Sequence, residues 1–438
     1  MNPDSNGLTR REFLACSALT SAALFTGCAI DPITGQQQFM VVSPEQELAI
    51  DRQNAPFQFS GDYGQVQDAN LVAYINRVGR GLAPFTHRPD MPYGFHPVNA
   101  VYVNAYAFPG GSIGITRGIL LGMKSEAALA SLLGHEMGHV NARHTAEQMS
   151  KGTLTSLIFA GVSAYVGSAT GYGDLASQLG QVASGVLLAS YSRENEREAD
   201  ALGLRYMVDG GYGPQGQVEL MELLRSLHKK KPSALDLMFA THPMSDERYR
   251  TVVQAVGAMP QSVRDLPLHR ERYMDHTASL RALSGAIETL QKGEKAMGGK
   301  KYGEAESLFA AALKEAPGDY AGLLMMAKCQ FVLERFSEMD RYAEEAQAVY
   351  PAEAQAWNVG GMAKMGRKKY EAAYEDFSRY GEILPGNPAT VFQKGYALEM
   401  MGRQAEAASH YKQYLQKVNR GKWAVHAATR LREWGYIR

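Results

Sequence analysis

The sequence contains two histidines four residues apart, with a glutamate directly after the first, in the run His135-Glu136-Met137-Gly138-His139. Residues with this spacing lie on one face of a helix, so both imidazoles can reach a single metal ion. Glu136 lies beside that face and could take a proton from a water molecule on the metal and pass it to a leaving amine. The motif therefore predicts hydrolysis of amide bonds with the help of a zinc ion.

A catalytic zinc ion needs a third protein ligand and one open position. The acidic stretch over residues 196–200 supplies candidates, because Glu196 and Asp200 are again four residues apart on a predicted helix. We expect Glu196 to be the third ligand of one zinc ion per chain. Asp200 would accept a hydrogen bond from a ligand imidazole and so fix its tautomer. Glu194 and Glu198 remain alternatives for the third ligand.

The neighbouring segments predict the elements that must position these side chains. Residues 93–98, 101–108 and 112–117 are rich in β-branched and aromatic residues, which is typical of strands. A helix is expected to begin at the Ser125-Glu126 cap and to run past His144, carrying both histidines. Further helices are predicted over residues 43–54, 69–82, 192–207, 214–228 and 245–259.

The C-terminal part has a repeated pattern. Pro317, Pro351 and Pro385 are spaced by 34 residues, and small and aromatic residues keep the same register. This pattern resembles the tetratricopeptide repeat, in which small residues let paired helices approach closely and aromatic residues fill the groove between them. We expect repeats over residues 286–319, 320–353, 354–387 and 388–421, followed by a capping helix.

The first 27 residues are typical of a bacterial export signal. Residues 9–14 form a twin-arginine pattern, and the uncharged apolar run after it is shorter than the roughly 20 residues that a membrane span requires. Gly27-Cys28 resembles a lipobox, in which the cysteine is acylated and becomes the new N-terminus. Ala29 then favours delivery to the outer membrane. A secretory signal with an incidental cysteine is the alternative.

The composition excludes several classes of protein. The chain has 438 residues, 45 of them basic and 45 acidic, so its formal net charge is zero. Such a balance lacks the basic excess of a nucleic-acid-binding protein. The hydrophobic content of 45% is too high for a disordered chain. The length suits two or three domains.

With Asn104-Ala105-Tyr106-Ala107-Phe108 upstream, the two metal-binding motifs resemble those of the Ste-type gluzincin peptidases, a family that includes the CAAX prenyl proteases. The lipobox and the C-terminal repeats are similar to a bacterial periplasmic subgroup of that family, which acts in β-barrel assembly. The resemblance covers nearly the whole chain. It implies an α+β, mainly helical protein with a signal peptide over residues 1–27, a zinc metallopeptidase domain with a small β-sheet over 28–270, and an α-solenoid of repeats over 277–438.

The resemblance also implies roles for individual residues. It makes His135, His139 and Glu196 the zinc ligands, Glu136 the general base and acid, and Asp200 a support behind the ligands. Thr241-His242-Pro243, followed by Arg248, matches a further pattern of the family. His242 would therefore lie near the metal, where it stabilises the oxyanion or binds zinc in place of water and keeps the enzyme latent. Arg248 would support the site.

Gluzincins bind substrate as an added strand along a sheet edge, through backbone hydrogen bonds. Gly110, Gly111 and Ser112 are candidates for this close approach, although an ordinary hairpin turn explains them equally well. The glycine-rich stretch over residues 151–188 is expected to form a lid or plug over the site, with a helical hairpin for dimer or membrane contact as the alternative.

Together these features predict a zinc endopeptidase held by a lipid on the periplasmic side of the outer membrane. Its substrates would be unfolded or misassembled outer-membrane proteins, and its repeats would recruit them or the β-barrel assembly machinery. No nucleic-acid partner is expected. The alternative is a chaperone or assembly factor that acts through its repeats and has a latent metal site. The sequence leaves the oligomeric state and the cleavage preference open.

Overall fold

The computed structural model describes residues 28–40, 42–150, 191–230, 238 and 241–438. The predicted signal peptide and the predicted lid over residues 151–188 lie outside these residues.

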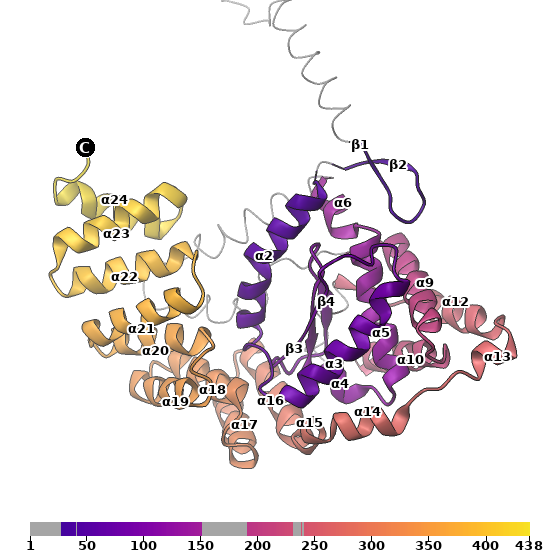
Figure 1. The fold of residues 1–438 in the computed structure, drawn as a ribbon. Helices are drawn as coiled ribbons and strands as arrows, with labels where there is room; N and C mark the ends of the chain where they lie inside the picture. Colours follow the sequence, from indigo (N-terminus) through magenta and orange to yellow (C-terminus); the bar gives the residue numbers. More distant parts are fainter. Residues whose placement is uncertain (1–27, 41, 151–190, 231–237, 239–240) are drawn as a thin grey trace, which may run out of the picture.

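Two groups of elements are present, which we call the N-terminal domain and the repeat domain (Figure 1). The described elements of the N-terminal domain are β1 (Cys28–Ile30), β2 (Gln37–Phe39), α2 (Pro44–Gly61), α3 (Ala69–Leu82), η1 (Ala83–Phe85), β3 (Gly94–Val98), β4 (Ala105–Ala107), β5 (Ser112–Thr116), α4 (Arg117–Gly122), α5 (Glu126–Asn141), α6 (His144–Ser150), α9 (Arg193–Asp209), α10 (Gln215–Lys230), α12 (Asp246–Gly257), α13 (Gln261–Arg264), α14 (Arg270–His276) and α15 (Ala278–Ala282).

The repeat domain follows directly. Its elements are α16 (Ser284–Gly298), α17 (Tyr302–Glu315), α18 (Tyr320–Val332), α19 (Phe336–Val349), α20 (Gln355–Gly366), α21 (Tyr370–Ile383), α22 (Pro388–Met400), α23 (Gln404–Lys417) and α24 (Lys422–Glu433). The predicted fold class, mainly helical with a small sheet and a helical repeat domain, is confirmed. Within the described residues, no helix is both long and apolar enough to cross a membrane.

A small sheet supports the N-terminal domain. Its strand order is β3-β5-β4, with β5 parallel to β3 and antiparallel to β4. Ile113 and Ile115 on the central strand are fully buried, as is Phe95 on β3. Helix α3 packs against β3, and α5 contacts β4. The sheet therefore fixes the position of α5, the helix that carries the two histidines.

Helices α5 and α9 lie unusually close together because small residues face each other at their crossing. A Cβ atom on Gly203 of α9 would lie 2.8 Å from the backbone nitrogen of His135 on α5. On the other side, a Cβ atom on Gly138 would lie 3.1 Å from Cα of Ala199. Real Cβ atoms rarely come so near, so glycine is needed for this approach. The backbones of α5 and α9, which carry the two metal-binding motifs, therefore lie almost in contact at this crossing.

The predicted continuous helix past His144 is wrong. Helix α5 ends at Asn141, and α6 begins at His144. The break lies at Arg143, whose φ of 57° is in the left-handed region. Such a backbone is unfavourable for a residue with a side chain, and surrounding contacts must hold it. Here Arg143 is buried and donates from Nε to Oε1 of Glu47 at 2.8 Å and from Nη2 to the carbonyl of Val42 at 2.7 Å.

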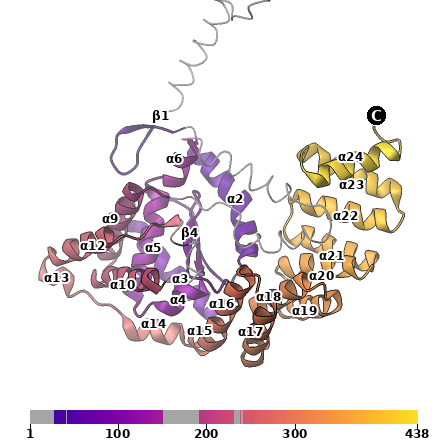
Figure 2. The same ribbon diagram turned by 180° about the vertical axis from the view of Figure 1, so that it is seen from behind.

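The repeat domain consists of helix pairs in the register expected from the sequence. A Cβ atom on Gly293 would lie 2.4 Å from the ring of Phe309, and one on Gly361 would lie 2.6 Å from the ring of Phe377. The missing side chains thus make room for the aromatic rings of the paired helices, as the 34-residue pattern implies. The pairs stack into an arc beside the N-terminal domain, with α2 on the side that faces the repeats (Figures 1 and 2).

The two domains share an interior. One cluster of buried apolar side chains runs from Tyr63 in the N-terminal domain to Ala397 in the repeats. Polar contacts reinforce the junction: the side-chain amide of Gln355 on α20 donates to the carbonyl of Ser60, at 3.1 Å, at the end of α2. A residue of the repeats therefore caps a helix of the N-terminal domain.

Candidate metal centre

Two helices bring the predicted ligands together. Helix α5 presents His135 and His139, and α9 presents Glu196. The two Nε2 atoms lie 3.1 Å apart. The carboxylate of Glu196 lies 3.3 Å from Nε2 of His139 and 3.7 Å from Nε2 of His135. All three residues are buried.

These side chains fit a zinc ion. Ligand atoms about 2.0–2.1 Å from a tetrahedral zinc ion lie roughly 3.3–3.4 Å from one another, close to the measured separations. The donor set of two imidazoles and one carboxylate is also typical of catalytic zinc. Oε2 of the adjacent Glu136 is buried and lacks a hydrogen-bond partner among the described residues. A buried carboxylate oxygen with no partner suits a base that accepts a proton from a bound molecule.

Asp200 lies behind the centre, where the sequence predicts it. Its Oδ1 atom is 3.0 Å from Nδ1 of His135, on the opposite side of the ring from the metal position. Arg248 holds this carboxylate with two hydrogen bonds of 2.8 Å and also reaches Oε2 of Glu196 at 2.5 Å. The positive charge of Arg248 therefore holds the carboxylates of Asp200 and Glu196 in place and offsets the repulsion between them.

His242 joins the same cluster. Its Nδ1 atom lies 2.9 Å from Oε1 of Glu196, and its Nε2 atom lies 3.9 Å from Oε1 of Glu136. Candidate ligand atoms of His135, His139, Glu196 and His242 all lie within 4.8 Å of one another. His242 is thus close enough to interact with a metal ion or with a molecule bound to it.

Burial and neighbouring charges shift the pKa values of the centre in opposite directions. Burial raises the pKa of Glu136, although His242 and His135 oppose the change. Burial also acts to raise the pKa of Glu196, but His242 and Arg248 outweigh it and hold that pKa well below its usual range. Burial lowers the pKa of His139 well below its usual range, which favours the neutral imidazole that binds metals.

The remaining candidates for the third ligand point elsewhere. Glu194 is exposed and pairs with Arg197 at 3.0 Å. Glu198 lies 3.1 Å from Nε2 of His144. Sequence reasoning missed His144 and also missed Tyr191, whose ring stacks on that of His139 with centroids 3.8 Å apart. The only signal for His144 in the sequence is a further histidine five residues after His139.

Comparison with known proteins agrees with this geometry. Residues 70–256 match the profile of Peptidase family M48. The matched domain belongs to that family. The chain is 27% identical to the β-barrel assembly-enhancing protease of Escherichia coli over 293 residues, which cover 60% of this chain and 58% of the relative. It is 29% identical to the protease of that name from Yersinia pestis over 236 residues, covering 50% of this chain and 45% of the relative.

A shorter relative matches along nearly its full length. Metalloprotease YcaL of Escherichia coli is 28% identical over 255 residues, which cover 56% of this chain and 97% of the relative. By contrast, the chain spans about half the length of the assembly-enhancing proteases. The M48 motifs His135-Glu136-Met137-Gly138-His139 and Glu196 to Asp200 both fall within the matched residues.

Gly110 and Gly111 lie in the turn between β4 and β5, and Ser112 follows them. Ser112 begins the central strand β5, and its amide donates to Asp51 on α2 at 2.9 Å. The amide of Gly111 donates to the carbonyl of Phe108 at 3.0 Å. Asp51 and the turn thus use the amides of Ser112 and Gly111, an arrangement that fits the alternative of an ordinary turn rather than a substrate-binding edge. Because β5 is the central strand, the edge of the sheet next to it is formed by β4.

Proposed function

We propose that the protein is a zinc-dependent endopeptidase that binds one zinc ion per chain through His135, His139 and Glu196. The convergence of these three side chains carries the proposal, together with the neighbouring Oε2 of Glu136, which has no hydrogen-bond partner in the part of the chain that the structure describes. Zinc at such a site acts as a Lewis acid towards water and towards a peptide carbonyl. Glu136 would take the proton from the attacking water and give it to the amine of the departing peptide.

Asp200 and Arg248 would keep the centre in shape. Oδ1 of Asp200, 3.0 Å from Nδ1 of His135, would accept the proton on that nitrogen when a metal is bound and so leave the lone pair of Nε2 for the metal, while Arg248 contacts both Asp200 and Glu196. Two roles for His242 remain open in this proposal. It donates to the oxyanion that develops on the substrate, or it fills the fourth position and keeps the enzyme latent.

The outer edge of β4 is the proposed site for the substrate strand. Strand β4 contacts α5, the helix that carries His135 and His139, and it lies at the end of the sheet. Asn104, directly before it, is fully buried, and neither polar atom of its side chain has a hydrogen-bond partner among the described residues. An added strand on β4 would supply backbone groups for pairing.

The proposed location is the periplasmic face of the outer membrane, with a lipid on Cys28. The proposed substrates are misfolded or stalled outer-membrane proteins, and the repeats would engage them or the β-barrel assembly machinery. The names of the assembly-enhancing relatives and the lipobox-like sequence support this part of the proposal.

The test uses purified protein and a denatured outer-membrane β-barrel protein as substrate. We expect one zinc per chain by elemental analysis and cleavage of the substrate. Glu136→Gln is expected to retain zinc and to lose at least about 100-fold in rate. Glu194→Gln removes the same charge from the exposed start of α9 and is the matched control, with no loss expected. Equal cleavage by wild type and Glu136→Gln would overturn the proposal.

A second function is favoured by the presence of His242 among the possible ligands. If His242 fills the fourth position, the protein acts mainly as a chaperone through its repeats, with a latent metal site. Zinc-loaded wild type would then not cleave, whereas His242→Ala would. Restoration of outer-membrane integrity in cells by Glu136→Gln would support the same function.

A further inference from the structure

His144 makes a buried contact with the back of the metal centre that the roles above do not use. Its Nδ1 atom lies 2.9 Å from Nδ1 of His139, and its Nε2 atom lies 3.1 Å from Oε2 of Glu198. We propose that His144 and Glu198 form a hydrogen-bond relay that holds His139 in its metal-binding tautomer and orientation. This inference deepens the proposed function and rests on metal binding by His139.

One assignment of protons gives each hydrogen bond between His139, His144 and Glu198 one donor and one acceptor. A neutral imidazole has one N–H donor and one acceptor nitrogen. Because His139 directs Nε2 towards the metal, its proton is on Nδ1, which donates to Nδ1 of His144. The proton of His144 is then on Nε2, which donates to the carboxylate of Glu198. The negative charge of Glu198 thus acts on His139 through the intervening ring and increases the basicity of its Nε2 atom.

The two histidine ligands are supported in different ways. His135 contacts a carboxylate directly, that of Asp200. Nδ1 of His139, by contrast, contacts His144, which in turn contacts the carboxylate of Glu198. The ring of Tyr191 is stacked on His139 with an interplanar angle of 18°, and its hydroxyl lies 3.0 Å from Oγ1 of Thr145, the neighbour of His144. The His139 ring is therefore held along one edge by the relay and across one face by Tyr191.

The break between α5 and α6 makes the relay possible. On a continuous helix, residues five positions apart differ by about 140° in direction, so His144 would point away from His139. The left-handed backbone of Arg143 turns the chain back and brings His144 against His139. Glu47 is fully buried and anchors the Arg143 guanidinium. Contacts that hold Arg143 in an unfavourable backbone conformation are typical of functional sites, so we infer that the turn serves to place His144.

The test compares two substitutions of nearly equal shape. Asn at position 144 keeps an acceptor oxygen near the position of Nδ1, whereas Leu removes it. We expect His144→Leu to weaken zinc binding by about 10–100-fold, measured by competition with a chromophoric chelator. His144→Asn is expected to weaken it by less than about 10-fold, and Glu198→Gln by a few-fold, because a glutamine oxygen still accepts from His144. Glu194→Gln, on the same helix, is the control and leaves zinc affinity unchanged.

A second readout separates positioning from folding. Urea unfolding of the metal-free variants reports on folding alone, and the absorption spectrum of the Co²⁺-substituted protein reports on the ligands. The relay predicts altered cobalt spectra for His144→Asn and Glu198→Gln, even if His144→Leu fails to fold. Equal zinc affinities and equal cobalt spectra for wild type, His144→Asn and Glu198→Gln would overturn the relay alone. A wild-type protein without zinc affinity would overturn the proposed function and the relay with it.

Discussion

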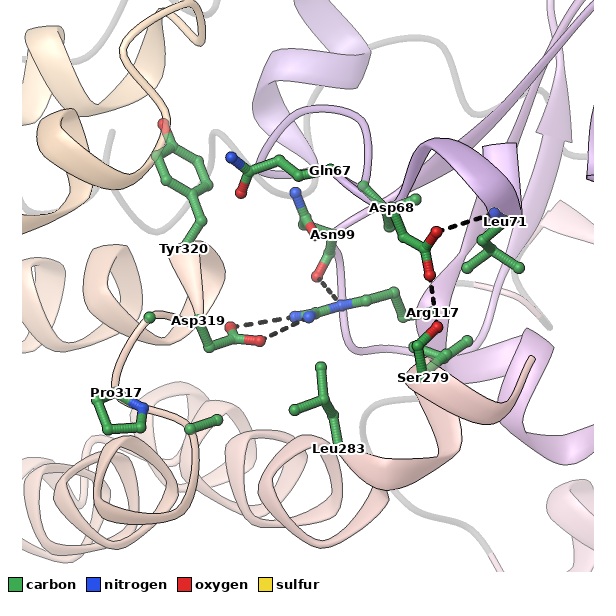
Figure 3. Close-up of a pocket in the computed structure, with 14 residues that line it drawn as sticks. Gln67, Asp68, Leu71, Asn99, Arg117, Ser279, Leu283, Pro317, Asp319 and Tyr320 are labelled. Atoms are coloured by element: carbon green, nitrogen blue, oxygen red, sulfur yellow. Dashed lines mark hydrogen bonds and ion pairs between the residues drawn. The ribbon is translucent and has the colours of Figure 1, made fainter. Parts of the chain in front are cut away.

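Arg117 in the N-terminal domain forms a buried two-pronged ion pair with Asp319 in the repeat domain (Figure 3). Nη1 of Arg117 lies 2.6 Å from Oδ2 of Asp319, and Nη2 lies 3.2 Å from Oδ1. Nε of the same guanidinium donates to the carbonyl of Asn99 at 2.9 Å. The pair lines a cavity of about 350 Å³ between the domains. Because the side chains are 5% and 3% exposed, the pair fixes the first repeats on the N-terminal domain.

Asp319→Asn is expected to destabilise the protein by about 3–5 kcal/mol, because it leaves the Arg117 charge buried without its carboxylate. Urea unfolding measures the loss, and hydrogen exchange at the amides around residues 316–324 locates it. The control is Glu345→Gln, which removes one carboxylate of an exposed pair with Arg341 on α19. Exposed pairs of this kind contribute less than about 1 kcal/mol. Similar losses in both variants would contradict the anchoring role of Arg117 and Asp319.

Gly203→Ala is expected to weaken both folding and zinc binding. The added methyl group meets the backbone of α5 at His135 and must push α9 away from it. Overpacking of this kind costs about 1–3 kcal/mol, and the ligands on the two helices move apart with the backbone. Denaturant unfolding and zinc titration test the two effects.

The matched control is Gly81→Ala in α3, where a new Cβ atom would have no atom of the described residues within 4 Å. Alanine is favoured over glycine in a helix by up to about 1 kcal/mol, so this variant is expected to be as stable as wild type or more so. A Gly203→Ala protein with wild-type stability and zinc affinity would show that the close crossing of α5 and α9 is not required.

Stability is expected to fall between about pH 4.5 and 7 through Glu294 on α16. Burial raises the pKa of Glu294 to about 7; the charge of Lys328 opposes this rise and that of Asp62 adds to it. An unfolded glutamate titrates near 4.5, so in this window the folded protein retains a proton that the unfolded chain has released. The stabilisation by Glu294 is therefore fully present below pH 4.5, the pKa in the unfolded chain, and it is lost as the pH rises through about 7, the pKa in the folded protein.

Glu294→Gln removes this titration, and its free energy of unfolding is expected to fall less than that of wild type over the same pH range. Glu288→Gln, at an exposed position of the same helix, is the control and keeps the wild-type pH dependence. Burial lowers the pKa of Lys328 to about 8, so Lys328 acts in a more alkaline window and does not mask the effect. Parallel pH profiles of wild type and Glu294→Gln would refute this prediction.

Removal of the metal is expected to destabilise the N-terminal domain. A ligand that binds only the folded state adds about 2.7 kcal/mol to stability at 100 times its dissociation constant. Unfolding of the metal-free protein, with and without added zinc, measures this difference. His139→Asn removes a proposed ligand and is expected to abolish most of the gain. An equal gain in that variant would place the stabilising zinc elsewhere.

The parts of the centre that follow from local spacing could be predicted from the sequence. His135 and His139 lie on one helix face because of helical periodicity, and Glu196 and Asp200 follow the same rule on α9. The repeats were also predictable, because each unit encodes its own packing, as Gly361 and Phe377 illustrate.

Features that depend on distant contacts could not be predicted in this way. The break before His144 requires the left-handed Arg143, which is held by Glu47, 96 residues earlier in the sequence. The amide of Ser112 is engaged by Asp51, 61 residues away. Local propensity favours a continuous helix in the first case and an exposed turn in the second. Both features depend on residues of α2, Glu47 and Asp51, which contact Arg143 and Ser112 only when α2 is packed in the folded domain.

The cap that Gln355 places on α2 has an evolutionary consequence. A gene fusion that joined this N-terminal domain to a foreign repeat array would remove the side-chain amide that now donates to the carbonyl oxygens of Ser60 and Gly61. It would also cut through the apolar interior that both halves build together. We therefore expect α2 and the repeats as far as α22, which carries Ala397 of the shared cluster, to behave as one inherited unit, and stable chimaeras to have their crossover point beyond α22.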